Sequence, residues 1–344
     1  MIIALDAMGG DRAPVEPVRG AVLASREFGI DIALVGDAAA LYVELERQGG
    51  TELAIQIVNA NEVIAMDEQP VQAVRQKKDA SINVAMQLVK KGEASGVVSA
   101  GNTGAVMTSG LLNLGRVPGI ERPALGTLAP YTDAGVLVLD VGANADCKPS
   151  YLLQFAQMGA VYAQKVQGIA QPRIGLLNIG EEETKGNELA QEVFVLLQHS
   201  GLNFIGNVEP DRLHLGIADV VVTDGFTGNI AVKSTEGAAE FIFRQLRAVI
   251  LSKTQYRLAA LVLKPALLTM RRRMDYGEYG GAPLLGVNGV VIITHGRADA
   301  NAIKNSLRAA RESASSGLLE TLRGAFSRGE RAAVAPGVTP FRQP

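Results

Sequence analysis

Short apolar runs alternate with longer amphipathic segments along most of the chain. The apolar runs are nearly continuous rather than alternating in polarity, which is typical of strands buried on both faces of a sheet. They predict strands over residues 2–6, 30–35, 54–59, 96–99, 135–141, 173–179, 203–205, 219–223 and 290–294. The amphipathic segments predict helices over residues 15–28, 38–48, 81–91, 104–114, 151–167, 188–199, 228–251, 256–274 and 298–313. Since strand and helix alternate with short glycine-rich connections, we expect an α/β fold with a doubly wound, largely parallel sheet and helices on both faces.

The alternation continues without a fixed repeat or a long linker, so we expect a single α/β domain over residues 1–329. It is interrupted over residues 251–275, where the pattern predicts an inserted helical hairpin. Residues 330–344 show no periodicity and are expected to form a flexible tail.

Composition narrows the class of protein. The chain has 344 residues, 47% of them hydrophobic, which is enough for a full core. A net charge of −2, 5% aromatic residues and no tryptophan give no support for nucleic-acid binding. A single cysteine, Cys147, builds no disulfide framework and is expected to be a buried, unreactive thiol. With no basic signal segment and no long apolar stretch, the sequence predicts a cytoplasmic protein.

Polar breaks follow the carboxyl ends of the predicted strands. Ligands of open parallel sheets bind outside those ends, glycines let the backbone approach a ligand, and helix N-termini favour anions. Ordinary turn chemistry is the alternative for any single break. Because we expect all the breaks at one edge of the sheet, a shared phosphate or other anion site is favoured. The breaks are residues 6–10, 36–37, 99–104, 140–148, 178–187, 224–229 and 294–297.

Several familiar motifs are missing from these breaks. SAGNTGA does not fit the dinucleotide pattern G-x-G-x-x-G, and GEEETKGN does not fit the P-loop pattern. The sequence contains no H-E-x-x-H motif and no EF-hand loop, and His199 and His214 are isolated. We therefore expect neither a metal ion nor a bound cofactor.

Candidate charged residues lie in three of the breaks and just after a fourth. Lys185, in EEETKGN, either faces bound phosphate or is a solvated turn lysine paired with the glutamates at 181–183. Lys148 and Lys233 are weaker candidates for the same role. His295, in ITHGRAD, either donates to an oxyanion or caps the next helix.

The predicted hairpin has a distinctive composition. Its segment LAALVLKPALLTM is apolar almost all round and is followed by arginines at 271–273. It is too short and too broken to span a bilayer. Shallow insertion beneath anionic headgroups and burial in a subunit interface are both consistent with this pattern. The basic residues Lys253, Arg257 and Lys264 would equally suit an acidic carrier protein.

A series of motifs resembles that of bacterial phosphate acyltransferases. In chain order the motifs are ALDAMGGDRAP, VSAGNTGA, RPALGTLAP, LDVGANADCKP, LLNIGEEETKGN, FIGNVEPDRL, VTDGFTGN and GVNGVVIITHGRAD. The resemblance runs from about residue 1 to about residue 310. It implies formation of acyl phosphate from acyl-(acyl carrier protein) and inorganic phosphate, for phospholipid synthesis. It also implies a homodimer, a fold similar to phosphotransacetylases and isopropylmalate dehydrogenases, and peripheral membrane association through the hairpin.

The expected mechanism is direct attack of phosphate on the thioester carbonyl, without a metal, a cofactor or a covalent acyl-enzyme. Phosphate is already anionic and needs positioning rather than a strong base. Lys185 and Asn229 are the expected donors to the tetrahedral oxyanion. The residues expected to bind phosphate or substrate are Asp6, Gly9, Gly10, Ser99, Asn102, Thr103, Gly104, Asn144, Asp224, Gly228 and His295. Those expected to contact an anionic membrane are Leu258, Leu261, Val262 and Leu263.

Three other functions remain open. A phosphotransacetylase that uses acyl-CoA would need an adenosine site, which is not obvious in the sequence. A decarboxylating dehydrogenase would need a cluster of metal-binding carboxylates, which is not evident. A lipid-responsive binding protein that has lost catalysis is disfavoured by the intact motifs around Lys185 and Asn229.

The glycerol-3-phosphate acyltransferase that would consume the product is a further expected partner.

Overall fold

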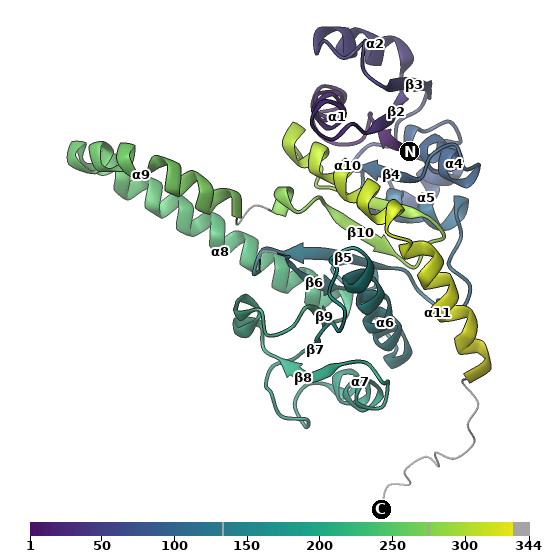
Figure 1. Ribbon diagram of the computed structural model, residues 1–344, viewed down its shortest axis with the longest axis vertical. Helices are drawn as coiled ribbons and strands as arrows, with labels where there is room; N and C mark the ends of the chain where they lie inside the picture. The colour runs from purple at the N-terminus through teal and green to yellow at the C-terminus, as the bar shows by residue number, and fades with distance from the viewer. Residues whose placement is uncertain (133, 274–275, 333–344) are drawn as a thin grey trace, which may run out of the picture.

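The computed structural model describes residues 1–132, 134–273 and 276–332. Strands and helices alternate along the chain as the hydrophobic pattern predicts (Figure 1). The strands are β1 (Ile2–Asp6), β2 (Asp31–Gly36), β3 (Ile55–Asn59), β4 (Gly96–Ser99), β5 (Ala124–Ala129), β6 (Val136–Leu139), β7 (Ile174–Leu177), β8 (Phe204–Val208), β9 (Val220–Val222), β10 (Ala282–Leu285) and β11 (Val290–Ile293). The helices are α1 (Val15–Phe28), α2 (Ala38–Arg47), α3 (Pro70–Gln76), α4 (Ser81–Lys90), α5 (Thr103–Asn113), α6 (Pro149–Lys165), α7 (Glu188–Gln198), α8 (Gly225–Ser252), α9 (Thr254–Arg273), α10 (Ala300–Ser315) and α11 (Leu318–Ala332), with short 3₁₀ turns η1 (Pro210–Leu215) and η2 (Tyr276–Glu278).

The strands form one sheet in the order β3-β2-β1-β4-β11-β10-β5-β6-β9-β7-β8. The first five strands in this order are mutually parallel, and so are the last four. Between them β10 and β5 pair antiparallel with both neighbours. The largely parallel, doubly wound sheet is therefore confirmed.

The antiparallel strands reverse the direction of the sheet halfway across. The carboxyl ends of β1, β2, β4 and β11 point one way, and those of β6, β7 and β9 point the opposite way. The expectation that all the polar breaks share one edge is therefore wrong. The breaks at 6–10, 36–37, 99–104 and 294–297 form a first edge. Those at 140–148, 178–187 and 224–229 form a second edge.

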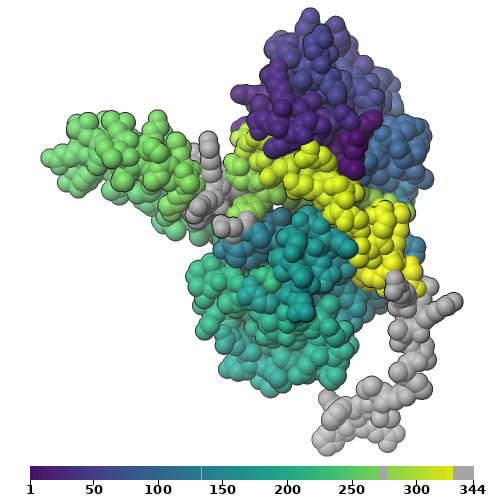
Figure 2. Space-filling view, viewed as in Figure 1, coloured from purple at the N-terminus to yellow at the C-terminus, as the bar shows by residue number. Residues whose placement is uncertain are grey.

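Side chains of alternate residues on each strand enter two different core layers. On β1, Ile3 and Leu5 pack with α1 and α10, whereas Ala4 packs with α4 and α5 on the other face. In the second half, α6, α7 and α11 cover one face of the sheet and Val232 of α8 packs on the other. Figure 2 shows α10 and α11, in yellow, lying across the junction between the halves.

The long helix α8 and its partner α9 project from the body as an antiparallel pair (Figures 1 and 2). The sequence predicts both arms within residues 251–275, but the structure uses the distal part of α8 as one arm and α9 as the other. At 28 residues, α8 is about 42 Å long. None of the described helices is long and apolar enough to cross a membrane. Residues 274–275, the side chains of the arginines at 271–273, and residues 333–344 of the expected tail lie outside the described part.

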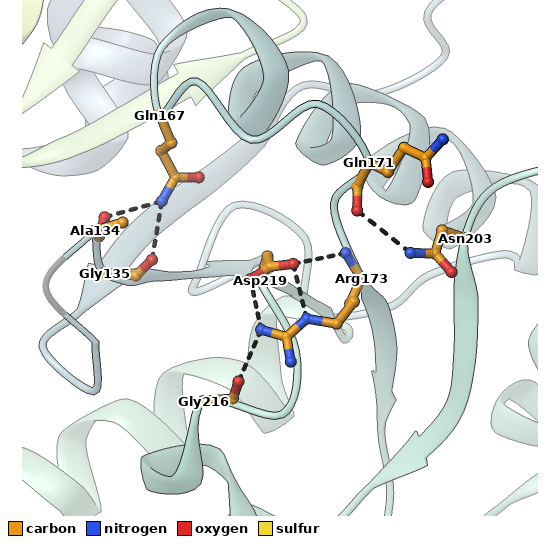
Figure 3. A network of polar contacts seen from close by, with 8 residues as sticks. All are labelled: Ala134, Gly135, Gln167, Gln171, Arg173, Asn203, Gly216 and Asp219. Atoms are coloured by element: carbon orange, nitrogen blue, oxygen red, sulfur yellow. Dashed lines mark hydrogen bonds and ion pairs between the residues drawn. The ribbon is translucent and has the colours of Figure 1, made fainter.

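A polar network holds together the amino ends of the strands in the second half (Figure 3). The Arg173 guanidinium donates to both carboxylate oxygens of Asp219, at 3.0 and 2.8 Å, and to the Gly216 carbonyl at 2.8 Å. Burial raises the pKa of Asp219, but the hydrogen bonds and charge of Arg173 outweigh it and leave the pKa below 3.8. These residues precede β7 and β9, so the network lies at the end opposite the second edge and serves folding rather than the site.

Candidate active site

The first edge is organised around a buried carboxylate. Asp6 ends β1, is 3% exposed, and accepts hydrogen bonds from the hydroxyls of Ser81 at 2.6 Å and Ser99 at 2.7 Å. The Ser99 hydroxyl in turn accepts from the backbone N–H of Gly101 at 3.0 Å. Burial raises the pKa of Asp6, while the two serine hydroxyls and the backbone act in the opposite direction. The carboxylate thus fixes the loop after β4 and the start of α4 relative to β1.

Close backbone packing explains the glycine after this strand. A Cβ on Gly9 would lie 2.7 Å from a carboxylate oxygen of Asp6 and 2.8 Å from the Gly101 nitrogen. No side chain fits there without moving backbone. A small hollow lies beside these glycines. It is lined by Asp6, Gly9, Val63, Ile64, Ser81, Ile82, Gly101, Asn102, Ala105 and Val106.

Asn102 borders this hollow and also caps α5. Its side-chain oxygen accepts from the Ala105 N–H at 3.1 Å, and its amide donates to the Met66 carbonyl at 2.9 Å. The next residue, Thr103, is exposed, and a Cβ added to Gly104 would lie 2.7 Å from the ring of Pro70. The structure therefore brings together Asp6, Gly9, Gly10, Ser99, Asn102, Thr103 and Gly104 at the first edge.

A second buried carboxylate organises the second edge. Asp140 follows β6, is fully buried, and accepts from the backbone N–H groups of Leu125, Gly142, Ala143 and Asn144 at 2.7–3.2 Å. The Asn144 side chain adds a further hydrogen bond at 2.8 Å. Burial raises the pKa of Asp140, and these donors oppose the rise.

The loop shaped by Asp140 packs against the first turn of α8. The Asn144 carbonyl accepts from the Gly225 N–H at 2.7 Å, and Asp224 caps the helix by accepting from the Thr227 N–H at 2.8 Å. A Cβ on Gly228 would lie 2.0 Å from the Asp140 carbonyl oxygen, so this turn admits only glycine. Asn229 follows it and is exposed.

Lys185 lies in the loop after β7, also at the second edge. Its ammonium is 3.9 Å from Glu182, and its backbone carbonyl accepts from the Asn178 amide at 3.1 Å. In the part of the chain that the structure describes, no contact joins Lys185 to Asn102 or Asn229. Its side chain is 47% exposed, which fits the alternative of a paired turn lysine.

His295 follows β11 at the first edge. Its Nδ1 accepts a hydrogen bond from the Arg297 N–H at 3.1 Å. Burial and the positive charges of Lys233 and Arg297 lower its pKa, and the charges of Glu236 and Asp11 oppose them. Lys233 and Glu236 belong to α8, so the charges of that helix act on the first edge.

Cys147 lies near the second edge but is not activated. Its sulfur is half-buried and 3.5 Å from the Asn144 carbonyl oxygen. Burial and the charge of Asp140 raise its pKa to about 12, so the thiol stays protonated at neutral pH. Among the described residues, no group of three or more His, Cys, Asp or Glu side chains is arranged to hold a metal ion.

Two central residues of this geometry, Ser81 and Asp140, are not among the candidates from the sequence. Asp140 lies inside one of the polar breaks, and its position after an apolar strand was the available signal. Ser81 has no local signal, because its contact with Asp6 joins positions 75 residues apart.

Sequence comparison gives the family. The family model described as "Fatty acid synthesis protein" matches residues 1–321. A phosphate acyltransferase from Desulfitobacterium hafniense is 52% identical over 324 residues, which are 94% of this chain and 97% of that protein. Another, from Heliobacterium modesticaldum, is 54% identical over 313 residues, which are 91% and 93% of the two chains. The chain therefore belongs to this family and, like these relatives, is a phosphate acyltransferase.

Solved structures support the fold alone. A phosphotransacetylase from Streptococcus pyogenes superposes with a TM-score of 0.59 at 20% identity, covering 91% of this chain and 94% of that one. A phosphotransacetylase from Staphylococcus aureus gives 0.58 at 16% identity, with the same coverage. The similarity to the phosphotransacetylase fold is confirmed.

Proposed function

We propose that this enzyme transfers the acyl group of acyl-(acyl carrier protein) to inorganic phosphate, and that the acyl phosphate feeds phospholipid synthesis. The relatives carry the phosphate acyltransferase name, and the structural observation that supports a phosphate site is the hollow at the first edge, where Gly9, Gly101 and Asn102 meet. Part of its lining is apolar, but Gly9, Gly101 and Asn102 present backbone and an amide on the remaining side, which suit a compact anion.

The proposed site combines the two edges. Inorganic phosphate binds beside Gly9, Gly101 and Asn102, and the thioester enters between the first edge and the first turns of α8. Asp6 is an anion and is not proposed to bind phosphate itself. Its role is to hold the Ser81 and Ser99 hydroxyls, which shape the hollow. This arrangement needs no metal and no covalent acyl-enzyme, since phosphate itself is the nucleophile.

A matched pair of variants tests the site. Asp6→Asn leaves one acceptor oxygen where the carboxylate offered two, so one serine hydroxyl must turn away. Hydrogen bonds to a charged group contribute about 1.5–3 kcal/mol each, so activity should fall by roughly 10- to 100-fold. Asp37→Asn is the control, because asparagine still caps α2 by accepting from the Ala40 N–H. Equal activity of the two variants would contradict the proposed site.

The donor thioester is tested by a direct comparison. Solved structures with this fold include phosphotransacetylases, and acyl-CoA is therefore the competing donor to test. Acyl carrier protein and acyl-CoA with the same acyl chain should be offered at equal concentration, and thiol release should be followed. We expect faster release from the carrier protein. Preference for acyl-CoA would replace the proposed donor and leave the phosphate site intact.

The projecting hairpin is proposed to place the enzyme on an anionic membrane, as a peripheral cytoplasmic protein. Leu258, Leu261, Val262 and Leu263 are all exposed on α9, together with Arg257 and Lys264, and Lys253 is exposed just before this helix. Apolar side chains beside cations fit shallow insertion under anionic headgroups. We further propose a homodimer, which would double this contact, and access there to the downstream glycerol-3-phosphate acyltransferase.

The role of Lys185 as an oxyanion donor also stays a proposal. Loss of one such donor typically lowers kcat by about 10²- to 10³-fold. Lys185→Ala with unchanged kcat would instead assign this lysine to its pair with Glu182.

A further inference from the structure

His295 lies directly beside the proposed phosphate site. The backbone N–H of Thr294 donates to the Ser99 carbonyl at 2.9 Å, and that of Asp11 donates to the Gly296 carbonyl at 2.8 Å. The loop that carries His295 is therefore held between the loop after β1 and the end of β4. The imidazole is exposed at this edge rather than packed into the core.

A hydrogen bond to Nδ1 indicates which ring nitrogen carries the proton. The Arg297 N–H donates to Nδ1, so Nδ1 bears a lone pair and Nε2 bears the hydrogen in the neutral ring. Burial, Lys233 and Arg297 lower the pKa of His295, and Glu236 and Asp11 act in the opposite direction with less effect. At neutral pH the ring is thus uncharged and presents an Nε2–H donor.

Helix α8 carries a charged pair that acts electrostatically on His295. Lys233 acts electrostatically on His295, and its ammonium is held 2.7 Å from Glu236. Asn229 lies one helical turn before Lys233, so both side chains share one face of α8. The charges that act on the imidazole from α8 are those of Lys233 and Glu236, whereas the Asn229 amide lies beside Gly142 in the loop after β6.

We propose that His295 is a catalytic residue whose Nε2–H donates to the thioester carbonyl oxygen, which carries the negative charge in the tetrahedral intermediate. This inference rests on the proposed function and identifies a hydrogen-bond donor for the oxyanion that forms during acyl transfer. A neutral imidazole donates this hydrogen bond without the cost of desolvating a charged ring when substrate binds.

The reaction balances with hydrogen phosphate as the only co-reactant. One oxygen of HPO₄²⁻ forms a bond to the carbonyl carbon, and the carbonyl π electrons move to the oxygen that faces Nε2–H. When the intermediate collapses, the carbonyl re-forms and the carbon–sulfur bond breaks. The proton of hydrogen phosphate passes to the departing thiolate, which leaves acyl phosphate and the free thiol of the carrier. His295 donates a hydrogen bond and loses no proton.

Two isosteric substitutions separate this role from helix capping. His295→Asn places an amide oxygen where Nδ1 accepts from the Arg297 N–H, but it has no group at the Nε2 position. His295→Gln can place an amide N–H near the Nε2 position, but it loses the acceptor at Nδ1. A capping role therefore requires the asparagine variant to be the more active, and an oxyanion role requires the glutamine variant to be the more active.

The experiment measures kcat and KM of wild type and both variants with acyl carrier thioester and phosphate, after thermal melts confirm folding. We expect His295→Asn to lose about 10²- to 10³-fold in kcat with KM little changed. We expect His295→Gln to recover at least about tenfold of that loss. Equal kcat in the two variants, or higher kcat in His295→Asn, overturns the inference. If the wild type forms no acyl phosphate from any thioester, the proposed function itself is overturned. If the wild type is active but His295→Asn equals or exceeds His295→Gln in kcat, only the role of His295 is overturned.

Discussion

Replacing Leu258 and Leu261 by glutamate tests the proposed membrane contact of the hairpin. The two leucines lie three residues apart on α9 and share a face of that helix. Their exposed fractions are 62% and 67%, so neither substitution removes much packing within the protein. The double variant should fold normally and lose its affinity for anionic vesicles.

The size of the effect follows from the exposed surface of these side chains. Complete burial of one leucine contributes about 1.5–3 kcal/mol. The exposed fractions of Leu258 and Leu261 together correspond to about 1.3 leucine side chains, so transfer to the acyl region contributes about 2–4 kcal/mol. The vesicle affinity should therefore fall by about 30- to 700-fold, since 1.4 kcal/mol is tenfold. Repulsion of two glutamates by anionic headgroups adds to this loss.

Co-sedimentation with vesicles of anionic and of neutral lipid gives the affinity, and circular dichroism gives the melting temperature. Tyr42→Glu combined with Val43→Glu is the control, because these side chains on α2 are 56% and 54% exposed and far from the hairpin in sequence. The control should sediment like wild type. If the α9 variant still binds vesicles at wild-type affinity, the membrane contact is refuted. Dissociation of a dimer in that variant would assign the hairpin to a subunit interface.

Three further predictions concern the scaffold. Gly228→Ala should lower the free energy of unfolding by about 1–3 kcal/mol in a denaturant titration, because its Cβ would lie 2.0 Å from the Asp140 carbonyl oxygen; unchanged stability would contradict the close packing. Arg173→Met should destabilise the protein at pH 7, and the difference from wild type should shrink as pH falls through the depressed pKa of Asp219, because a lowered carboxyl pKa stabilises the fold only above that range; a difference independent of pH would contradict the ion pair. Cys147→Ala should keep wild-type kcat, because the thiol, with a pKa of about 12, is protonated at neutral pH; an isolable acyl-thioester on Cys147 would contradict direct attack.

The hydrophobic pattern predicted the parallel strands well but missed β5 and β10. Their sequences, ALGTLA and APLL, contain small residues and a proline instead of the continuous β-branched and leucine runs found in β6, β9 and β11. They are strands because neighbours on both sides supply hydrogen bonds, which is a tertiary effect. Missing them led to the incorrect expectation of a single edge.

The grouping of the candidate site residues could be predicted only in part, because it too depends on the strand order. Local turn chemistry identified the loops around Gly9, Ser99 and Asn102, which the structure brings together at the first edge. It could not show that Lys185 follows a strand of opposite direction, nor that Lys233 of α8 acts electrostatically on His295. Both facts depend on the strand order of the whole sheet.

Mass spectrometry of the product formed with ¹⁸O-labelled phosphate tests acyl transfer to phosphate directly. The enzyme should be mixed with acyl carrier thioester and phosphate carrying label on all four oxygens, and the acyl product should be measured before it hydrolyses. We predict an acyl phosphate that retains all four labelled oxygens, together with one free carrier thiol per acyl phosphate. Release of free fatty acid without any acyl phosphate, or no dependence of thiol release on phosphate, would contradict direct attack by phosphate on the thioester.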